Sequence, residues 1–190
     1  KITDEALYDV IDFYTREAGV RKLERTVAAI CRKSAKLIAS GEKKQVKVTS
    51  STLKTMLGKK RYIPEELLEK DEIGIINGLA WTSVGGEIMQ LEVAVLSGSG
   101  KLELTGSLGE VMQESAKSAL SYVRANAEKY GIDPDFYKDK DIHIHATEGA
   151  VPKDGPSAGV AITTALVSAL TGRAVRRDIA MTGEVTIKGR

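Results

Sequence analysis

Apolar residues recur at helical spacing through the first 62 residues. Thr3, a preferred N-cap residue, opens a helix predicted to end at Gly19; a second helix follows to Gly41, and a third covers residues 53–57. Residues 45–49 are predicted to form a short strand before the third helix. The order of these elements predicts a small, mainly helical unit over residues 1–62.

The acidic stretch over residues 63–72 is predicted to be a linker, because helical periodicity stops there and glycine-rich strands follow. The pattern then predicts strands between residues 75 and 104, a helix over 109–130, a strand near His143, a helix after Ser157, and strands over 179–181 and 185–187. The long helix is expected to face the sheet with Val111, Ala119, Val123 and Ala127. Residues 73–190 are therefore predicted to form an α/β (α+β) domain.

The run from Pro152 to Gly159 presents one serine between turn residues and the start of an apolar helix. Ser157 is expected at the helix N-terminus, where unpaired amides and the positive dipole end would stabilise an oxyanion. Such an oxyanion forms when a hydroxyl attacks a carbonyl, so we interpret Ser157 as a nucleophile of acyl transfer. Serine is also a common N-cap residue, and that structural interpretation stays open.

The literal pattern G-x-S-x-G of α/β-hydrolases is present from Gly155 to Gly159. Pro152 and Pro156 interrupt the strand that a nucleophile elbow requires. The histidine of that class follows the serine, whereas both histidines here precede it. The context therefore argues against a hydrolase elbow.

Residues 148–159, with Thr182-Gly183-Glu184, resemble the proteolytic domain of Lon, a family of ATP-dependent proteases. The likeness continues through Gly78-Leu79-Ala80-Trp81-Thr82, Gly85-Gly86, Lys101-Leu102, the segment from Thr105 to Ser115, and Asp135-Phe136-Tyr137. The resemblance implies a serine endopeptidase that degrades misfolded and regulatory proteins, with Ser157 as its nucleophile.

The resemblance also implies that a lysine amine, rather than a histidine, takes the serine proton in a Ser-Lys dyad. In the family this lysine lies in a Gly-Gly-Leu-Lys-Glu-Lys segment after Thr-Gly-Glu, and the chain stops at Arg190 before reaching it. The base is therefore expected beyond Arg190, and residues 1–190 alone are expected to be inactive. Lys153, expected in a solvated loop, and Lys188, expected on an exposed strand, are not assigned this role.

Three further residues are candidates for supporting the site. The resemblance places Thr182 beside the dyad, where its hydroxyl could hydrogen-bond the lysine amine, and matches Glu92 to an acidic position near the site. An exposed strand glutamate is an equal interpretation of Glu92. Asp154 is the third candidate, although a turn aspartate that hydrogen-bonds its own backbone is the commoner explanation.

No metal site is predicted. His143 and His145 alternate along one strand and would project from one face, but a third ligand is not evident nearby. The run from Gly98 to Lys101 lacks the residues of a Walker A loop, which needs glycine at Val95 and Ser or Thr at Leu102. It is predicted to be a tight turn between two strands.

Residues 1–62 resemble the small helical lid of AAA+ ATPases, in which an arginine after Gly-Val senses the nucleotide. Arg21 matches that position, and its planar cation could reach the γ-phosphate of ATP. The implied cofactor is ATP with Mg²⁺, bound mainly by a large AAA+ subdomain outside this chain; the peptidase step needs none. The alternative is that Arg21 pairs with Glu17 or Glu24 on the helix surface.

Composition fits a soluble enzyme fragment, with 42% apolar and 28% charged residues in 190. No apolar run approaches the length of a membrane span, and the N-terminus lacks the order of a signal peptide. The single Cys31 suits a reducing cytosol, so we expect a cytoplasmic protein without membrane contact. Seven basic residues would allow a weak DNA contact, although a solvated face is the commoner meaning: Lys43, Lys44, Lys47, Lys54, Lys59, Lys60 and Arg61.

The sequence therefore predicts part of a homohexameric, ATP-dependent serine endopeptidase that acts on unfolded or tagged proteins, the hexamer being implied by the family. Two other hypotheses stay open. The chain could be a catalytically incomplete assembly and nucleotide-sensing fragment. It could also be a Ser-His esterase that uses His143 or His145.

Overall fold

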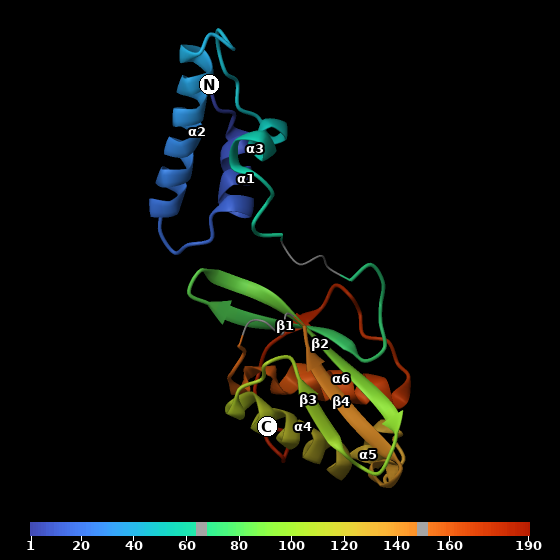
Figure 1. Ribbon diagram of the computed structural model, residues 1–190. Helices are drawn as coiled ribbons and strands as arrows, with labels where there is room; N and C mark the ends of the chain where they lie inside the picture. Colours follow the sequence, from blue (N-terminus) through green and yellow to red (C-terminus); the bar gives the residue numbers. More distant parts are fainter. Residues whose placement is uncertain (64–67, 148–151) are drawn as a thin grey trace. The chain divides into compact units, whose positions relative to one another are not determined.

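A computed structural model of the chain describes residues 1–63, 68–147 and 152–190. Residues 64–67 of the predicted linker lie outside the described residues. Contacts divide the chain into two compact units, Lys1–Glu65 with Thr82–Gly85, and Glu66–Trp81 with Gly86–Arg190 (Figure 1). The first unit is mainly helical, and the second contains the sheet.

The helical unit contains α1 (Asp4–Tyr14), α2 (Arg21–Ala39) and α3 (Ser50–Leu57). Thr3 caps α1 as predicted, since its side chain accepts a hydrogen bond from the Ala6 amide. Helix α1 ends well before Gly19, because Thr15 is extended and its hydroxyl donates to the Val10 carbonyl. The strand predicted over residues 45–49 is wrong, since only a single bridge from Val48 to Ile2 forms. The buried core of this unit consists of Ala6, Val10, Tyr14, Ile30, Val48, Leu53 and Met56.

The second unit has a mixed α/β fold, which confirms the predicted class. Its strands are β1 (Ile75–Thr82), β2 (Gly85–Ser97), β3 (Leu102–Thr105), β4 (Lys140–Ala146) and β5 (Ala180–Met181). Its helices are α4 (Glu110–Ala125), α5 (Ala127–Tyr130) and α6 (Gly159–Thr171), with 3₁₀ turns η1 (Phe136–Lys138) and η2 (Pro156–Ala158). Along the described ranges, no helix combines the length and the apolar character needed to cross a bilayer.

The five strands lie in the order β3-β4-β2-β1-β5. Strand β4 runs parallel to β3 and antiparallel to β2, and β5 runs parallel to β1. Helices α4 and α6 pack side by side on one face of the sheet (Figure 1). Ile142, Ile144 and Ala146 of β4 are buried on that face, so His143 and His145 lie together on the opposite one; that the two histidines share a face was predicted.

Two details of the predicted helix over 109–130 are wrong. The segment is broken at Asn126 into α4 and α5. Val111 is 44% exposed, and the buried face instead begins at Met112. The buried positions of α4 are Met112, Ser115, Ala116, Ala119 and Val123, which recur at three- and four-residue spacing.

The strand predicted over residues 185–187 is also wrong. Among the described residues this segment has no ladder partner, and it enters a turn in which the Gly189 amide donates to the Thr186 carbonyl at 2.8 Å. Lys188 therefore lies in an exposed turn rather than on a strand. The strand near residues 179–181 does form, as β5.

Candidate active site

Ser157 lies in the 3₁₀ turn η2, which leads directly into α6. Its side chain is exposed, whereas the next two residues, Ala158 and Gly159, are buried. The N-cap of α6 is Ala158, with no side-chain capping bond, so the interpretation of Ser157 as an N-cap is wrong. In the part of the chain that the structure describes, the Ser157 hydroxyl has no hydrogen-bond partner. It is therefore available to an incoming group.

The backbone of Ser157 is held by the two residues that follow β5. Its carbonyl accepts a hydrogen bond from the Gly183 amide at 2.7 Å and a longer one from the Thr182 hydroxyl at 3.4 Å. The Gly183 carbonyl in turn accepts from the Val160 amide at 2.9 Å. Residues 182–183 therefore bond both to η2, called the serine turn below, and to the first turn of α6. Sequence analysis selected Thr182, and the structure places it against the backbone of Ser157.

The absence of a side chain at Gly159 allows the start of α6, helix α4 and the segment around Val185 to approach one another next to Ser157. A Cβ at this position would lie 2.7 Å from the Val185 amide nitrogen and 3.0 Å from the Ser115 Oγ. Ser115, on α4, donates to the Pro156 carbonyl at 3.2 Å. Sequence analysis included Ser115 in a segment that carries the family resemblance but gave it no role in the site. The signal for Ser115 is a polar residue within the apolar stripe of α4, since such a residue usually has a specific partner.

Asp154 fixes the loop that precedes the serine. Its Oδ1 accepts hydrogen bonds from the Met112 amide at 3.0 Å and from the Gly155 amide at 2.9 Å. Met112 lies in the first turn of α4, so the carboxylate also lies where the helix dipole favours negative charge. Gly109, the N-cap of α4, leaves room for this contact, because a Cβ there would lie 2.3 Å from the Asp154 Cγ.

The same loop pairs with the connection between β3 and α4. Leu108 and Lys153 form a parallel bridge, in which the Gly109 amide donates to the Lys153 carbonyl at 2.6 Å. The Lys153 amide donates to the Ser107 carbonyl at 3.0 Å, and its side chain is half-buried rather than solvated. Gly155, two residues after Lys153, has φ +124°, a conformation that glycine adopts readily. The approach to Ser157 is thus fixed by backbone contacts on both sides.

The two histidines share one partner. The Thr105 hydroxyl lies 2.8 Å from His143 Nε2 and 2.7 Å from His145 Nδ1. Glu92 lies on β2 directly opposite His145. In the described ranges, no hydrogen bond or ion pair joins either histidine or Glu92 to Ser157, and no three potential ligands gather as a metal would require. The histidines are therefore engaged by Thr105.

Arg21 is the first residue of α2, and Glu17 caps this helix. The Glu17 carboxylate accepts from the Lys22 and Leu23 amides, both at 2.9 Å. Desolvation raises the pKa of Glu17, but these backbone bonds and the charges of Lys22 and Arg25 outweigh it and lower the pKa below its usual value. Within the described residues, the Arg21 side chain has no ion-pair or hydrogen-bond partner, so the alternative interpretation, a surface pair with Glu17 or Glu24, is wrong.

Comparison with known proteins assigns the family. Residues 47–190 match the Lon protease (S16) C-terminal proteolytic domain. The chain belongs to the Lon family. Residues 1–54 match the Lon protease AAA+ ATPase lid domain, and the resemblance inferred from the sequence is thereby confirmed.

Lon proteases of several bacteria resemble the whole chain. The Lon protease of Brevibacillus choshinensis is 54% identical over 190 residues, Lon protease 1 of Bacillus subtilis is 55% identical, and the Lon protease of Aquifex aeolicus is 54% identical. Each match covers 100% of this chain and 24% of the relative. The chain therefore spans about a quarter of the length of the curated Lon proteases that it matches.

Proposed function

We propose that the full-length protein carrying these residues is an ATP-dependent serine endopeptidase and that Ser157 is its nucleophile. The observation that carries the proposal is the exposed Ser157 hydroxyl, which no described residue hydrogen-bonds, on a turn whose backbone is bonded to Gly183 and to α4. A rigid support of this kind holds a reacting atom in one geometry, which lowers the entropic cost of attack. Family membership supports the same assignment.

The proposed reaction proceeds in two steps. Ser157 Oγ bonds to the peptide carbonyl carbon while its proton passes to a lysine amine; the C–N bond then breaks, and the leaving amine takes the proton. Water next attacks the acyl carbon with the same amine as base; the ester C–O bond breaks, the amine returns the proton to Ser157 Oγ, and the carboxylic acid product leaves. We propose that this lysine lies beyond Arg190. Thr182, already beside the Ser157 carbonyl, could orient the lysine, with Asp154 and Glu92 as supporting residues.

The test of this function is covalent labelling of the full-length protein. A fluorophosphonate probe reacts with activated serines, so we expect stoichiometric label on Ser157 and loss of peptide hydrolysis in proportion to labelling. Peptide mapping by mass spectrometry measures both the site and the extent. Inactivation with the label on another residue would remove Ser157 from the mechanism.

We also propose that residues 1–62 act as the lid of an ATPase module, joined by residues 63–72 to a proteolytic domain over 73–190. ATP with Mg²⁺ would be bound mainly by the large AAA+ subdomain, and Arg21 would contact the γ-phosphate. The exposed guanidinium of Arg21 supports this role, since the carboxylate of Glu17, one of its two candidate partners, is occupied by backbone amides of α2. A guanidinium is permanently charged and suits phosphate oxygens.

Arg21→Ala in the full-length protein should slow the degradation of folded proteins more than the cleavage of short unstructured peptides. A short peptide can reach Ser157 without ATP-driven unfolding, whereas a folded substrate cannot. Degradation of a folded reporter and of a fluorogenic peptide, measured in parallel, gives the ratio. Lys22→Ala serves as control, because it removes a neighbouring cation of α2. Equal loss of both activities in Arg21→Ala would contradict the coupling role.

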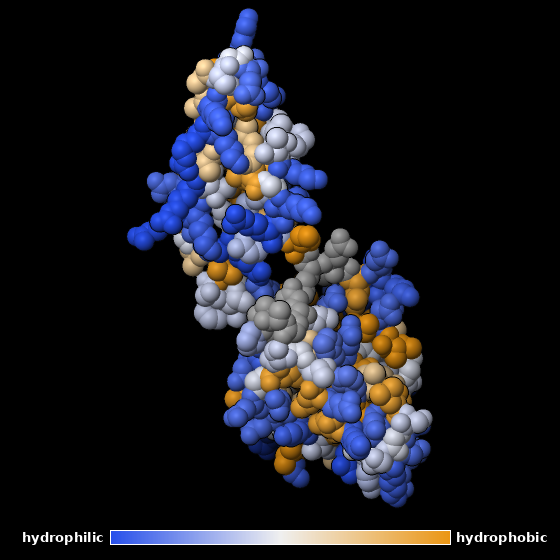
Figure 2. Space-filling view, in the orientation of Figure 1, coloured by the Kyte–Doolittle hydropathy of each residue, from blue (hydrophilic) through white to orange (hydrophobic). Residues whose placement is uncertain are grey.

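The proposed partners are unfolded or tagged proteins, five further copies of the chain in a homohexamer, and, weakly, DNA. Residues 1–62 hold fifteen Lys and Arg against seven Asp and Glu, whereas the remaining residues are net acidic. Hydrophilic side chains cover much of the visible face of the helical unit (Figure 2). This asymmetry supports contact with a polyanion. We propose a cytoplasmic location, which the single Cys31 supports.

The two rival hypotheses have different support. A Ser-His esterase needs an imidazole at Ser157, and the hydrogen bonds of His143 and His145 go to Thr105 instead, so the geometry disfavours it. The other rival is a protein that assembles and senses nucleotide but does not catalyse hydrolysis. This hypothesis holds if the full-length protein has no lysine positioned to act as base for Ser157. The labelling experiment separates this hypothesis from the peptidase, because a serine without a base reacts slowly.

A further inference from the structure

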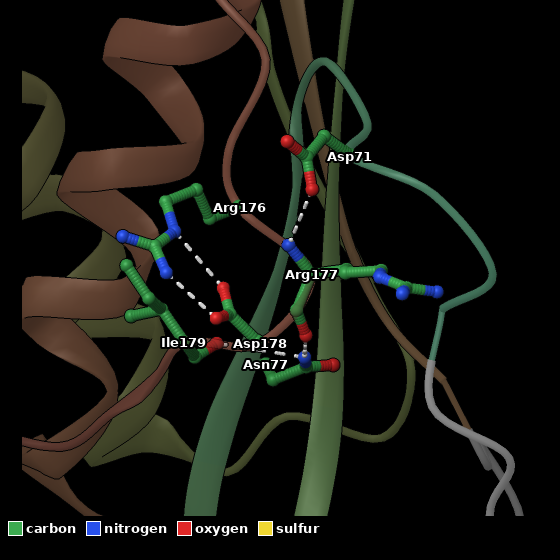
Figure 3. A network of polar contacts seen from close by, with 6 residues as sticks. All are labelled: Asp71, Asn77, Arg176, Arg177, Asp178 and Ile179. Carbon is green, nitrogen blue, oxygen red and sulfur yellow. Dashed lines mark hydrogen bonds and ion pairs between the residues drawn. The ribbon is translucent and has the colours of Figure 1, made fainter.

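A tight turn directly precedes β5. The Ile179 amide donates to the Arg176 carbonyl at 3.3 Å, which closes the turn over residues 176–179. The Arg176 guanidinium spans the turn and pairs with the Asp178 carboxylate at 3.0 and 2.7 Å (Figure 3). Hydrogen bonding to Arg176 lowers the pKa of Asp178. Both side chains are well exposed, so this pair alone holds the turn weakly.

Asn77 holds the same turn from inside the sheet. It lies on β1, is 2% exposed, and donates through Nδ2 to the Arg177 carbonyl at 3.0 Å and to the Ile179 carbonyl at 3.5 Å. From the other side, the Asp71 carboxylate accepts from the Arg177 amide at 3.0 Å. Figure 3 shows both groups pointing at Arg177. The backbone of this one residue is thus held through its N–H and its C=O.

Only the nitrogen of the Asn77 side-chain amide makes hydrogen bonds to the described residues. Its Oδ1 is buried and has no hydrogen-bond partner among the described residues. A buried acceptor left unpaired destabilises a fold, and asparagine is also disfavoured in strands. Neither property would favour asparagine at a buried position of a sheet for stability. The two donors of Nδ2 are what this residue supplies.

The turn matters because it sets the start of β5, which leads to the residues that hold Ser157. Strand β5 has two residues, paired as Asn77 with Ala180 and Gly78 with Met181. A ladder this short defines the register weakly. The next two residues, Thr182 and Gly183, hold the carbonyl of Ser157. The place at which the turn enters the sheet therefore determines where Gly183 meets the serine turn.

We infer that Asn77 is a positioning residue for Ser157, acting through the turn 176–179, β5 and Gly183. The inference rests on the proposed function of Ser157. Removing the Nδ2 donors frees the Arg177 carbonyl, lets β5 shift along β1, and moves Gly183 relative to the Ser157 carbonyl. Asn77 does not contact the substrate in this account; it controls the place of the nucleophile.

The test uses Asn77→Asp in the full-length protein, which keeps the shape of the side chain and replaces both donors by an acceptor. Fluorophosphonate labelling of Ser157 and kcat for a short fluorogenic peptide are measured from pH 6 to 9, each relative to wild type. We expect both ratios to fall by about 100-fold at pH 9, the effect of a misplacement near 1 Å, with KM nearly unchanged.

The pH profile distinguishes positioning from simple destabilisation. Burial raises the pKa of a carboxyl group at position 77, and the protonated acid can again donate to the Arg177 carbonyl. The ratio of variant to wild-type activity should therefore recover as the pH falls. While the pH is still above the pKa of this carboxyl group, each drop of one pH unit should raise the ratio by up to about tenfold. Ile76→Val is the matched control: it trims a buried side chain of the same strand, and its ratio should stay near one at every pH.

A second pair of variants tests the turn from its exposed side. Asp71→Ala removes the contact to the Arg177 amide, and Asp71→Asn restores an acceptor. We expect a smaller fall in kcat for Asp71→Ala than for Asn77→Asp, and recovery in Asp71→Asn. This pair decides the inference if Asn77→Asp does not fold.

Wild-type activity in Asn77→Asp or in Asp71→Ala would overturn the inference, and so would an activity ratio of Asn77→Asp to wild type that does not change with pH. Peptide hydrolysis by Ser157→Ala would instead overturn the proposed function and this inference together.

Discussion

Replacing Ser157 with alanine in the full-length protein should abolish peptide hydrolysis and leave ATP hydrolysis and hexamer formation near their wild-type levels. The hydroxyl is required for the covalent step alone. It makes no hydrogen bond to the described residues, so its removal costs the fold little. Fluorogenic peptide cleavage, phosphate release and size-exclusion chromatography measure the three properties.

The matched control is Ser121→Ala, which removes another exposed serine hydroxyl, on α4. This variant should retain all three properties and should change the free energy of unfolding by no more than about 0.5 kcal/mol. Proteolysis at the wild-type rate by Ser157→Ala would remove the serine from the mechanism. Loss of ATP hydrolysis together with proteolysis would point to a damaged fold instead.

The place of Ser157 could be predicted from the sequence because local signals determine it. Pro156 and Gly155 restrict the approach, and the apolar run from Ala158 onward predicts the buried helix α6. The sequence alone left two interpretations of Ser157 open, a nucleophile and an N-cap. Which residue takes the cap position depends on the fold, and in the structure it is Ala158, so the N-cap interpretation is excluded and the nucleophile role stays a prediction.

The errors have a common physical cause, since they concern contacts that are not local. Val185 and Ile187 alternate with polar residues as in a strand, but a strand also needs a partner with free backbone groups, and residues 185–187 have none in the part of the chain that the structure describes. Val111 is apolar but lies one position away from the buried stripe of α4, which begins at Met112. A hydrophobic pattern indicates the helical periodicity, but tertiary packing determines which residues of the helix face the core.

Asn77 shows how such a residue could be found from the sequence. Asparagine is disfavoured in strands, and this one lies between Ile76 and Gly78 in a stretch otherwise suited to a buried strand. A conflict between local preference and fold often marks a residue kept for another reason. The reason here is a contact to Arg177, one hundred positions away in the chain, which no local pattern could reveal.

Residues 1–190 on their own should hydrolyse peptides no faster than background, because the base that we propose for Ser157 lies beyond Arg190. A serine hydroxyl is a weak nucleophile at neutral pH, and a positioned general base contributes about 10²–10⁴ in rate. Extending the chain through a Gly-Gly-Leu-Lys-Glu-Lys segment should restore hydrolysis and fluorophosphonate labelling by a factor of this size. Circular dichroism of both chains checks that each is folded.

The pH dependence of the extended chain identifies the base. An amine accepts a proton only in its neutral form, so the rate should rise with pH through the pKa of the lysine and then level off. Replacing the lysine after Gly-Gly-Leu by methionine should remove this rise, while replacing the second lysine of the segment should leave it in place. Rapid labelling of Ser157 in residues 1–190 alone would mean that the base lies within them. Lys153, half-buried in the loop before the serine, would then be the first residue to substitute, ahead of the exposed Lys188 and of His145, which is bound to Thr105.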